Sequence, residues 1–315
     1  PTELSAGLHE PVEIEHVLMV GTTPGSALAE GPEHTLKIGT VAPGGTPWSK
    51  LLKRVRKRIQ KDSGGRVKVK LYLGGKIGGG SEKSLVSRCQ RGTVDGIAVS
   101  TGALGNAVPE LYAVELPYLF ETHKQAHKAL DASTDLLREL MEPKGFIFGS
   151  WGENGFRHFA SKQRFFETPS SLKGMKMRAQ QANPHVWMYQ QLGAGAHPIS
   201  AGEVTSSLAN GVVNGYDNTA LYAYAAQWYK EIKYLTLSGH IYQGAIIAWC
   251  KKGAWSQMDE GLQKLLLAEP ANATQKGRAE VGAMNKLLLK QYKALIDDGY
   301  GNKVVNPQIP GGIPC

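Results

Sequence analysis

Cysteine is scarce in this sequence: only Cys89, Cys250 and Cys315 occur among 315 residues. They belong to no CxxC pair and to no spacing typical of a zinc centre, which excludes a metal site built from cysteines. In an oxidising compartment Cys89 and Cys250 can form a disulfide, whereas three unrelated thiols is the simpler interpretation. Cysteine usage alone therefore leaves the compartment open.

Long apolar runs are also missing. No segment approaches the ~18–20 consecutive apolar residues that span a bilayer, so we expect no direct membrane insertion. Hydrophobic residues make up 42% and charged residues 20% of the chain. These proportions are typical of a globular protein rather than a disordered one, and the length allows two domains or one large one.

Signatures of catalysis are absent as well. The nine histidines form no HExxH motif and no GxSxG segment occurs. The glycine-rich stretch 74–80 has no lysine at the position that a phosphate-binding Walker A loop requires. We interpret it as a flexible loop that borders a ligand at most and precedes a helix at about 81–91. Glu153, Glu203 and Asp217 have no evident partner. We therefore expect no enzyme, no catalytic residue, no metal ligand and no cofactor.

Positive charge is in excess, with 36 Lys and Arg against 27 Asp and Glu and a pI of about 9.3. This balance favours anionic partners of any kind. Much of it lies in segment 50–61, where Leu51, Leu52, Val55 and Ile59 recur at helical spacing. The basic residues then cover the other faces of a helix, and because no nucleic-acid-binding motif accompanies them we expect a solvated surface and no nucleic-acid partner.

The first part of the chain, residues 1–34, is interpreted as an N-terminal extension or leader remnant. Ala27-Leu28-Ala29 resembles the small-residue cleavage site of a signal peptide. The apolar patch 17–20 is short for a signal peptide, and no basic region precedes it. A processed precursor and a simple extension both remain open.

Alternating apolar residues predict strands at 36–41 and 67–73 on either side of the basic helix. A strand, helix and strand in about 40 residues indicate a parallel βαβ unit and an α/β fold. Gly152 and Gly155, and later Gly239, interrupt apolar strands, and we predict that the chain crosses between two domains at 152–155 and near 239–240.

Three polar residues at predicted strand edges are candidates for binding a small carboxylate. In the strand 175–178 the methionines share one face and Arg178 lies on the other. A guanidinium matches a carboxylate with two parallel hydrogen bonds. Arg157 and Asn218 lie beside other predicted strands. Structural salt bridges for the arginines, and a helix cap for Asn218, are the alternatives.

The order of motifs resembles the substrate-binding proteins of TRAP transporters, the DctP family. Asn154–Arg157 matches an N-G-x-R segment, and 170–178 matches S-x-x-D-L-K-G-x-K-x-R with Ser171 in place of the aspartate. Segment 192–218 matches the longer pattern that ends in G-x-V-D-G-x-E-N. The resemblance covers about residues 35–300.

The resemblance implies a two-lobed periplasmic-binding-protein-like α/β fold, in which each lobe is a mixed sheet flanked by helices and a ligand cleft lies between the lobes. With the predicted crossings, lobe I comprises 35–152 and 240–280, and lobe II comprises 153–239 and 281–315. Such a protein is a periplasmic receptor that delivers a small organic acid to TRAP membrane subunits. A ligand-sensing domain of a signalling system and a periplasmic enzyme are the alternatives.

Site roles follow from the same resemblance. Arg178 becomes the principal carboxylate partner, Arg157 the second cation and Asn218 the residue that orients the carboxylate. Gln181 contacts polar groups of the ligand, and Ser100 lies on the opposite lobe. Closure is expected by hinge bending at about 150–153 and 237–242.

The sequence also departs from the family pattern, with Asn214 in place of the usual aspartate, Asp217 in place of the usual glutamate and Ala201 where some relatives have an aromatic residue. These changes predict a roomier, less polar pocket and an apolar or aromatic monocarboxylate as ligand. Five aromatic residues are candidates for the pocket, and a place in the core is the alternative for each: Trp48, Trp151, Trp187, Tyr216 and Tyr222.

Overall fold

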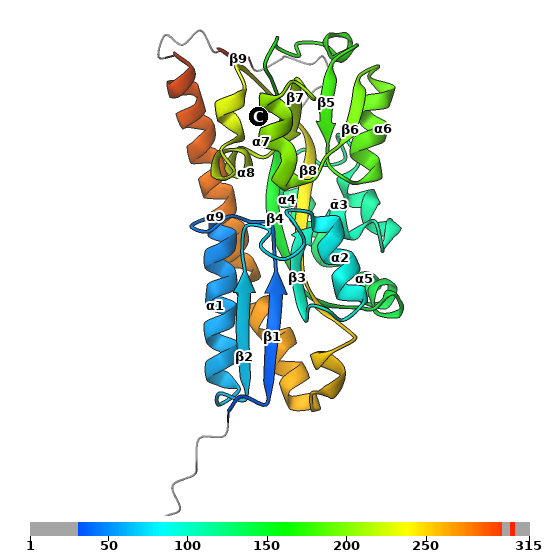
Figure 1. The fold of residues 1–315 in the computed structure, drawn as a ribbon, viewed down its shortest axis with the longest axis vertical. Coiled ribbons are helices and arrows are strands. Elements are labelled where there is room, and N and C mark those ends of the chain that lie inside the picture. The colour runs from blue at the N-terminus through cyan, green and yellow to red at the C-terminus, as the bar shows by residue number, and fades with distance from the viewer. Residues whose placement is uncertain (1–30, 298–302, 306–315) are drawn as a thin grey trace, which may run out of the picture. The chain divides into compact units, whose positions relative to one another are not determined.

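One mixed β-sheet organises the part of the chain that the computed structural model describes, residues 31–297 and 303–305 (Figure 1). Its strands are β1 His34–Gly39, β2 Val67–Tyr72, β3 Gly96–Ser100, β4 Phe146–Ser161, β5 Lys176–Ala179, β6 Gly195–Pro198, β7 Gly215–Asn218, β8 Tyr234–Cys250 and β9 Lys303–Val305. They are arranged in the order β2-β1-β3-β8-β4-β7-β5-β6, and β9 pairs with β8. The predicted α/β fold with a mixed, helix-flanked sheet is confirmed.

The centre of the sheet is a long antiparallel ribbon of β4 and β8. At one end of the ribbon β3 pairs with residues 245–249 of β8, and β1 and β2 follow as parallel neighbours. At the other end β7 pairs with residues 158–161 of β4, followed by β5 and β6 in parallel. The parallel pairing of β1 with β2 is the one predicted from the βαβ pattern.

The predicted breaks at the two glycine-rich crossings do not occur, because β4 and β8 each run through them as one strand. The ladder instead shifts register between Glu153 and Gly155 and again after Arg157. Gly155 has φ +99°, and a Cβ on Gly152 would lie 2.1 Å from the ring of Trp48. These glycines therefore mark a bulge and a close contact rather than strand ends.

The helices cover the sheet, and their bounds are α1 Pro47–Asp62, α2 Glu82–Gln90, α3 Thr101–Leu104, α4 His123–Ala132, α5 Thr134–Met141, α6 Asn183–Gln191, α7 Val204–Ala209, α8 Ala220–Ala225 and α9 Glu260–Asp297. Shorter 3₁₀ turns are η1 Pro109–Glu115, η2 Glu142–Lys144, η3 Pro169–Leu172, η4 Ala201–Glu203, η5 Trp228–Glu231 and η6 Ala254–Gln257. Within the described residues, no helix combines the length and the apolar character needed to cross a bilayer.

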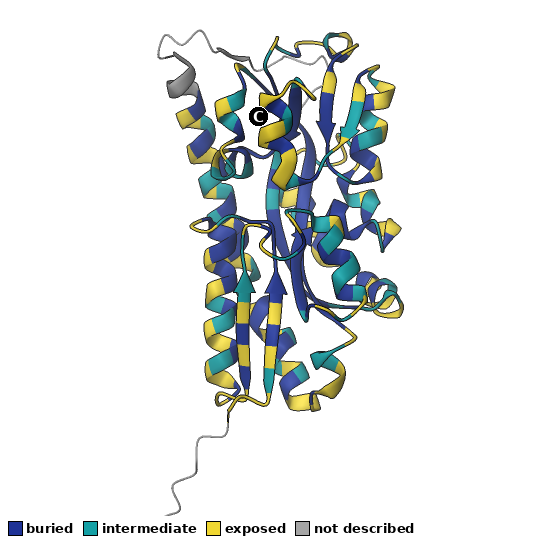
Figure 2. Ribbon diagram, viewed as in Figure 1, coloured by how far each residue is buried: buried dark blue, intermediate teal, exposed yellow. Residues whose placement is uncertain are grey.

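The basic helix α1 has the amphipathic character expected from its sequence. Leu51, Leu52, Val55 and Ile59 are buried, and the side chain of Thr46 caps its first turn by accepting a hydrogen bond from Ser49 N–H. Figure 2 shows the exposed positions of α1 alternating with this buried stripe, and it shows β4 and β8 buried along most of their length. Helix α2 begins after Ser81, as predicted.

Helix α9 is the longest element, with 38 residues. It packs against α1, β4 and α8, and Figure 1 shows it lying alongside α1. The predicted lobe boundary at 280/281 falls inside this continuous helix. The lobe assignment 35–152 with 240–280, and 153–239 with 281–315, remains a prediction, and the interpretation of residues 1–30 concerns a segment outside the described residues.

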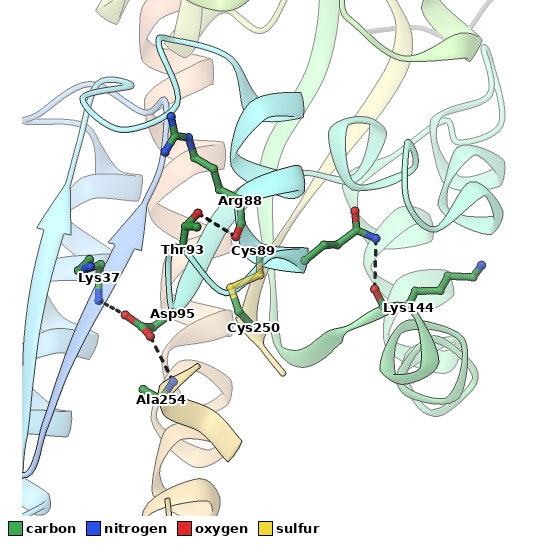
Figure 3. The surroundings of a disulfide bond; sticks show 9 residues. Lys37, Arg88, Cys89, Thr93, Asp95, Lys144, Cys250 and Ala254 are labelled. Atoms are coloured by element: carbon green, nitrogen blue, oxygen red, sulfur yellow. Dashed lines mark hydrogen bonds between the residues drawn. A yellow bond between two sulfur atoms is a disulfide. The ribbon is translucent and has the colours of Figure 1, made fainter. Parts of the chain in front are cut away.

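A disulfide joins Cys89 of α2 to Cys250 at the end of β8 (Figure 3). The interpretation as three unrelated thiols is therefore wrong for these two, while Cys315 lies outside the described residues. The bond closes a loop across a sequence separation of 161 residues, which restricts the unfolded chain and typically stabilises the native state by about 2–4 kcal/mol. Nearby, the Asp95 carboxylate accepts hydrogen bonds from the backbone N–H of Lys37 and Ala254.

Candidate ligand-binding site

A cavity lies where the carboxyl ends of β1, β3, β5 and β7 meet the middle of β4 and β8. Ligands of open α/β sheets bind outside the carboxyl ends of strands, because backbone and side-chain groups converge there. The cavity measures about 50 Å³ for the centres of water-sized groups, enough for a few water molecules or a small polar group. Its polar lining includes Thr40, Thr46, Glu82, Ser100, Glu153, Asn154, Arg157, Arg178, Gln180, Asn218, Thr219, Tyr222 and Gln243.

Arg178, on β5, borders the cavity with a buried charge that has no salt bridge to a carboxylate among the described side chains. Its side chain is 4% exposed, and its Nε–H donates to the carbonyl oxygen of Ile199 at 3.0 Å. The guanidinium lies over the ring of Trp228, 5.2 Å from its centroid. Within residues 31–292, whose side chains are described, it forms no ion pair. Burial, reinforced by the nearby charge of Arg157, lowers the pKa of Arg178 to about 10.

Arg157, on β4, also borders the cavity but is committed to partners inside the protein. Nε–H donates to Asp217 Oδ2 and Nη2 to the Asp217 carbonyl, both at 2.6 Å. Nη1 donates to Gln180 at 3.0 Å and to Gln243 at 2.9 Å. Four of the five N–H groups of this guanidinium are therefore engaged. Burial is the largest influence and works to lower the pKa of Arg157, but the charge and hydrogen bond of Asp217 together with the charge of Glu115 outweigh it, and the pKa is raised.

The partners of Arg157 belong to a larger buried polar network beneath the cavity. Asp217 also accepts a hydrogen bond from the Tyr189 hydroxyl at 2.8 Å. His185 Nε2 lies 2.7 Å from Glu115 Oε2, and Gln243 Nε2 donates to the same oxygen at 3.1 Å. Burial acts to raise the pKa of Asp217 and Glu115, yet the neighbouring cation and hydrogen-bond donors hold both below their usual values. These hydrogen bonds tie β4, β7 and β8 to α6 and η1 beneath the cavity, while His185 Nδ1 is buried without a hydrogen-bond partner among the described residues.

A carboxylate, Glu82, borders the cavity from the N-terminal turn of α2. It accepts hydrogen bonds from the backbone N–H and the hydroxyl of Ser100, both at 2.8 Å. Gln180 donates to the same Ser100 hydroxyl at 2.7 Å, which links β3 to the segment after β5. Burial raises the pKa of Glu82 despite these hydrogen bonds. The cavity thus has a cation on β5 and hydrogen-bond acceptors near α2.

A family model described as DctP, bacterial extracellular solute-binding protein, family 7, matches residues 38–308. The chain belongs to this family. The predicted resemblance is thereby confirmed, and the description of the family is that of solute-binding proteins rather than enzymes.

Individual members support the same assignment. A solute-binding protein of Verminephrobacter eiseniae is 34% identical over 192 residues, which are 60% of this chain and 56% of the relative. This chain therefore matches little more than half the length of that curated relative.

Solved structures of two DctP-type proteins have the same fold. A TRAP periplasmic solute-binding protein from Polaromonas sp. JS666, bound to D-erythronate, has a TM-score of 0.81 and 28% identity, covering 87% of this chain and 88% of that one. The sugar acid binding protein DctPAm from Advenella mimigardefordensis, in complex with galactonate, has a TM-score of 0.82 and 25% identity, covering 88% and 87%.

Five of the residues predicted for the DctP-like site line the cavity: Arg178, Arg157, Asn218, Ser100 and Trp48. Asn218 is not the cap of the following helix, because Thr219 caps α8 and its backbone N–H donates to Asn218 Oδ1 at 2.8 Å. Gln181 lies beside the cavity, where its side-chain oxygen accepts from the Ser81 hydroxyl at 2.9 Å. The ligand roles of these residues stay predictions.

Three of the aromatic candidates lie elsewhere. Trp151 packs edge-on against Phe148 and donates to the Thr134 hydroxyl at 2.9 Å, so it belongs to the core. Tyr216 is buried edge-on against Trp228. Trp187 is 52% exposed. Of the remaining candidates, Trp48 and Tyr222 line the cavity.

Several residues that line the cavity were not predicted from the sequence, chiefly Glu82, Gln180, Gln243 and Trp228. A signal was available for Gln180, because it lies two residues after Arg178 and strand alternation directs both to one face. Nothing in the sequence distinguishes Glu82 from other acidic residues in a first helical turn. Its place at the cavity depends on the contact between α2 and β3.

Proposed function

We propose that this protein is a periplasmic receptor that binds a small organic acid through Arg178 and delivers it to TRAP membrane subunits. The observation that carries this proposal is the buried guanidinium of Arg178, which borders the cavity without a carboxylate partner among the described side chains. A charge of this kind is costly to bury alone. A ligand carboxylate would neutralise it with two charge-assisted hydrogen bonds.

The ligand that best fits the cavity carries hydroxyl groups as well as a carboxylate. Glu82 supplies acceptor oxygens for hydroxyl protons, and Asn154 and Asn218 supply amide groups. The two similar structures contain the hydroxylated acids D-erythronate and galactonate. The expectation of an apolar or aromatic monocarboxylate has no support here, and we replace it with a short polyhydroxylated acid.

The cavity is bridged by contacts that a hinge motion would make and break. Ser81 donates to Gln181, Gln180 donates to Ser100, and Asn106 Nδ2 donates to the Gln181 carbonyl at 2.8 Å. We infer that the lobes close over the ligand through the predicted hinges, and the register shifts of β4 after Glu153 support bending there. Closure would remove water from the ion pair between Arg178 and the ligand.

Periplasmic location is supported by the family and by the disulfide between Cys89 and Cys250, since disulfides persist in oxidising compartments. The membrane partner is inferred from the family alone.

Calorimetric titration with D-erythronate, galactonate and succinate tests the proposal. In Arg178→Met the best ligand should bind more weakly by about 2–5 kcal/mol, or roughly 30-fold to several thousand-fold, because a buried charged contact is lost. Arg91→Met, which removes an exposed arginine at the end of α2, serves as the control for net charge and should leave affinity unchanged. Equal affinities of Arg178→Met and the unmodified protein would refute the role of Arg178.

A further inference from the structure

Two histidines and a glutamate converge beside the cavity in an arrangement that the organic-acid site does not use. His123 and His127 are four residues apart on α4, so both rings lie on one face of the helix. Glu153 faces them from β4. Its Oε1 is hydrogen-bonded to His123 Nδ1, and its Oε2 lies 3.0 Å from His127 Nε2. One ligand atom from each residue lies within 4.8 Å of the other two.

The surroundings of this cluster are apolar on one side and open to solvent on the other. The rings of Phe156 and Tyr242 pack edge-on against His123, at centroid distances of 5.0 and 5.9 Å. The Tyr242 hydroxyl is buried and has no hydrogen-bond partner among the residues that the structure describes. Glu153 is 1% exposed, whereas the side chain of His123 is 44% exposed. An ion can therefore reach the cluster from solvent through the His123 side.

We propose that His123, His127 and Glu153 bind one divalent transition-metal ion, for which zinc is the best match. Two imidazole nitrogens and one carboxylate oxygen are a ligand set that zinc favours. Zinc takes nitrogen ligands at about 2.0–2.1 Å and carboxylate oxygens at about 2.0–2.2 Å in a tetrahedron. Zinc binding requires side-chain rotations that bring the three atoms, now within 4.8 Å of one another, to such a centre. Water takes the fourth position on the exposed side.

Binding changes the hydrogen bonds of the cluster in a defined way. The proton now shared between each imidazole nitrogen and Glu153 leaves with solvent or moves to the other ring nitrogen, so that a lone pair faces the metal. One Glu153 oxygen then binds the ion and no longer accepts hydrogen bonds from the imidazoles. The cluster is distinct from Arg178, the cation of the proposed organic-acid site, although Glu153 also borders the cavity.

The sequence contains neither an HExxH motif nor a cysteine spacing typical of a metal site. A His-x₃-His pair on a helix is a weak signal by itself. It becomes specific only when a third ligand, here 26 residues beyond His127 on another element, lies opposite.

Titration of chelator-treated full-length protein with zinc chloride, followed by calorimetry, tests the site. One equivalent should bind, and His123→Gln and His127→Gln should each weaken it by more than about 100-fold, since loss of mere outer-shell partners already costs about 10–100-fold. His197→Gln, on β6 outside the cluster, is the matched control and should bind as the unmodified protein does. Cobalt at the same site should give the visible spectrum of a tetrahedral centre, lost in the two variants.

Two results would overturn the assignment: no zinc bound by the unmodified protein, or equal zinc affinity in His123→Gln, His127→Gln and the unmodified protein. The second would place the binding on other residues of the chain. Thermal unfolding of each metal-free variant controls for misfolding, and Glu153→Gln, which keeps the size of the side chain, provides a third ligand variant. The organic-acid titration is read separately, so failure of either proposal is recognised independently of the other.

Discussion

Two buried arginines border the same cavity, and their surroundings differ sharply. Arg157 on β4 has an aspartate, two glutamines and a backbone carbonyl around its guanidinium. Arg178 on β5 has one backbone carbonyl and the face of Trp228. The same residue type therefore serves as an internal counter-ion in one region and, among the described side chains, as a cation without a salt bridge in the other.

The difference identifies which arginine is available to a ligand. A guanidinium that is already hydrogen-bonded to its own carboxylate gains little from a second one, whereas an unpaired buried guanidinium gains a full charge-assisted pair. The same difference assigns a role in stability to one arginine and a role in ligand binding to the other. Removing Arg157 should damage the fold, and removing Arg178 should damage binding.

The largest effect on stability is expected for Arg157→Met. This change leaves the buried carboxylate of Asp217 without its cation, which should lower the free energy of unfolding by about 3–5 kcal/mol. Urea unfolding followed by circular dichroism measures it. Adding Asp217→Asn should recover part of the loss, and a single variant as stable as the unmodified protein would remove the contrast between the two arginines.

A pH effect should arise from the region around Arg157 as well. His158 on β4 is buried, its Nδ1 accepts from Gly239 N–H at 3.1 Å, and burial together with the charge of His240 lowers its pKa to about 3. Because the folded-state pKa lies below the unfolded value of about 6.5, His158 stays neutral in the native protein while the unfolded chain takes up a proton. Its contribution to stability is thus complete above pH ~6.5 and is lost as the pH falls from there toward 3.

The measurement is the free energy of urea unfolding between pH 7 and pH 5. In His158→Asn, whose amide oxygen can still accept from Gly239, the slope of stability against pH should fall by up to about 1.4 kcal/mol per pH unit. His197→Asn serves as the control. An unchanged slope in His158→Asn would mean that other groups carry the acid sensitivity.

A smaller effect is expected beside Arg178, where the Tyr222 hydroxyl donates to the Val41 carbonyl at 3.3 Å. Tyr222→Phe removes this hydrogen bond and keeps the ring, which packs 5.3 Å from Trp228. The free energy of unfolding should drop by about 0.5–1.5 kcal/mol in thermal or urea unfolding. A loss near that of Arg157→Met would show that the surroundings of Arg178 contribute as much to the free energy of unfolding as those of Arg157.

The smallest effect on stability should be that of Arg178→Met without ligand. Removal of an unpaired buried charge should change the free energy of unfolding by less than about 1 kcal/mol, or raise it. The same urea unfolding series measures it next to Arg157→Met. Equal destabilisation by the two substitutions would contradict the comparison.

Regular elements were predictable because their periodicity lies in the sequence itself. The stripe of Leu51, Leu52, Val55 and Ile59 predicted α1, and the alternation in 67–73 predicted β2. The continuity of β4 was not predictable, because glycines that usually end strands here permit a bulge and the approach of the Trp48 ring. That approach involves residues about a hundred positions apart.

In the candidate site, too, some features were predictable from the sequence and others were not. Strand alternation and position marked Arg178 as a cation at a strand end, and the ordered motifs marked the family. The pairing of Arg157 with Asp217, the approach of Glu82 and the disulfide could not be obtained in this way. Each depends on distances between distant segments.

The order of apolar and polar residues along the chain was enough to determine the helices, most strands and the kinds of side chain at their ends, since these follow from backbone geometry over a few residues. Only the tertiary structure decided which charges are neutralised within the protein and which remain available at the cavity. The physical reason is that burial and pairing of a charge depend on neighbours brought together by the sheet, and local sequence carries no measure of that distance.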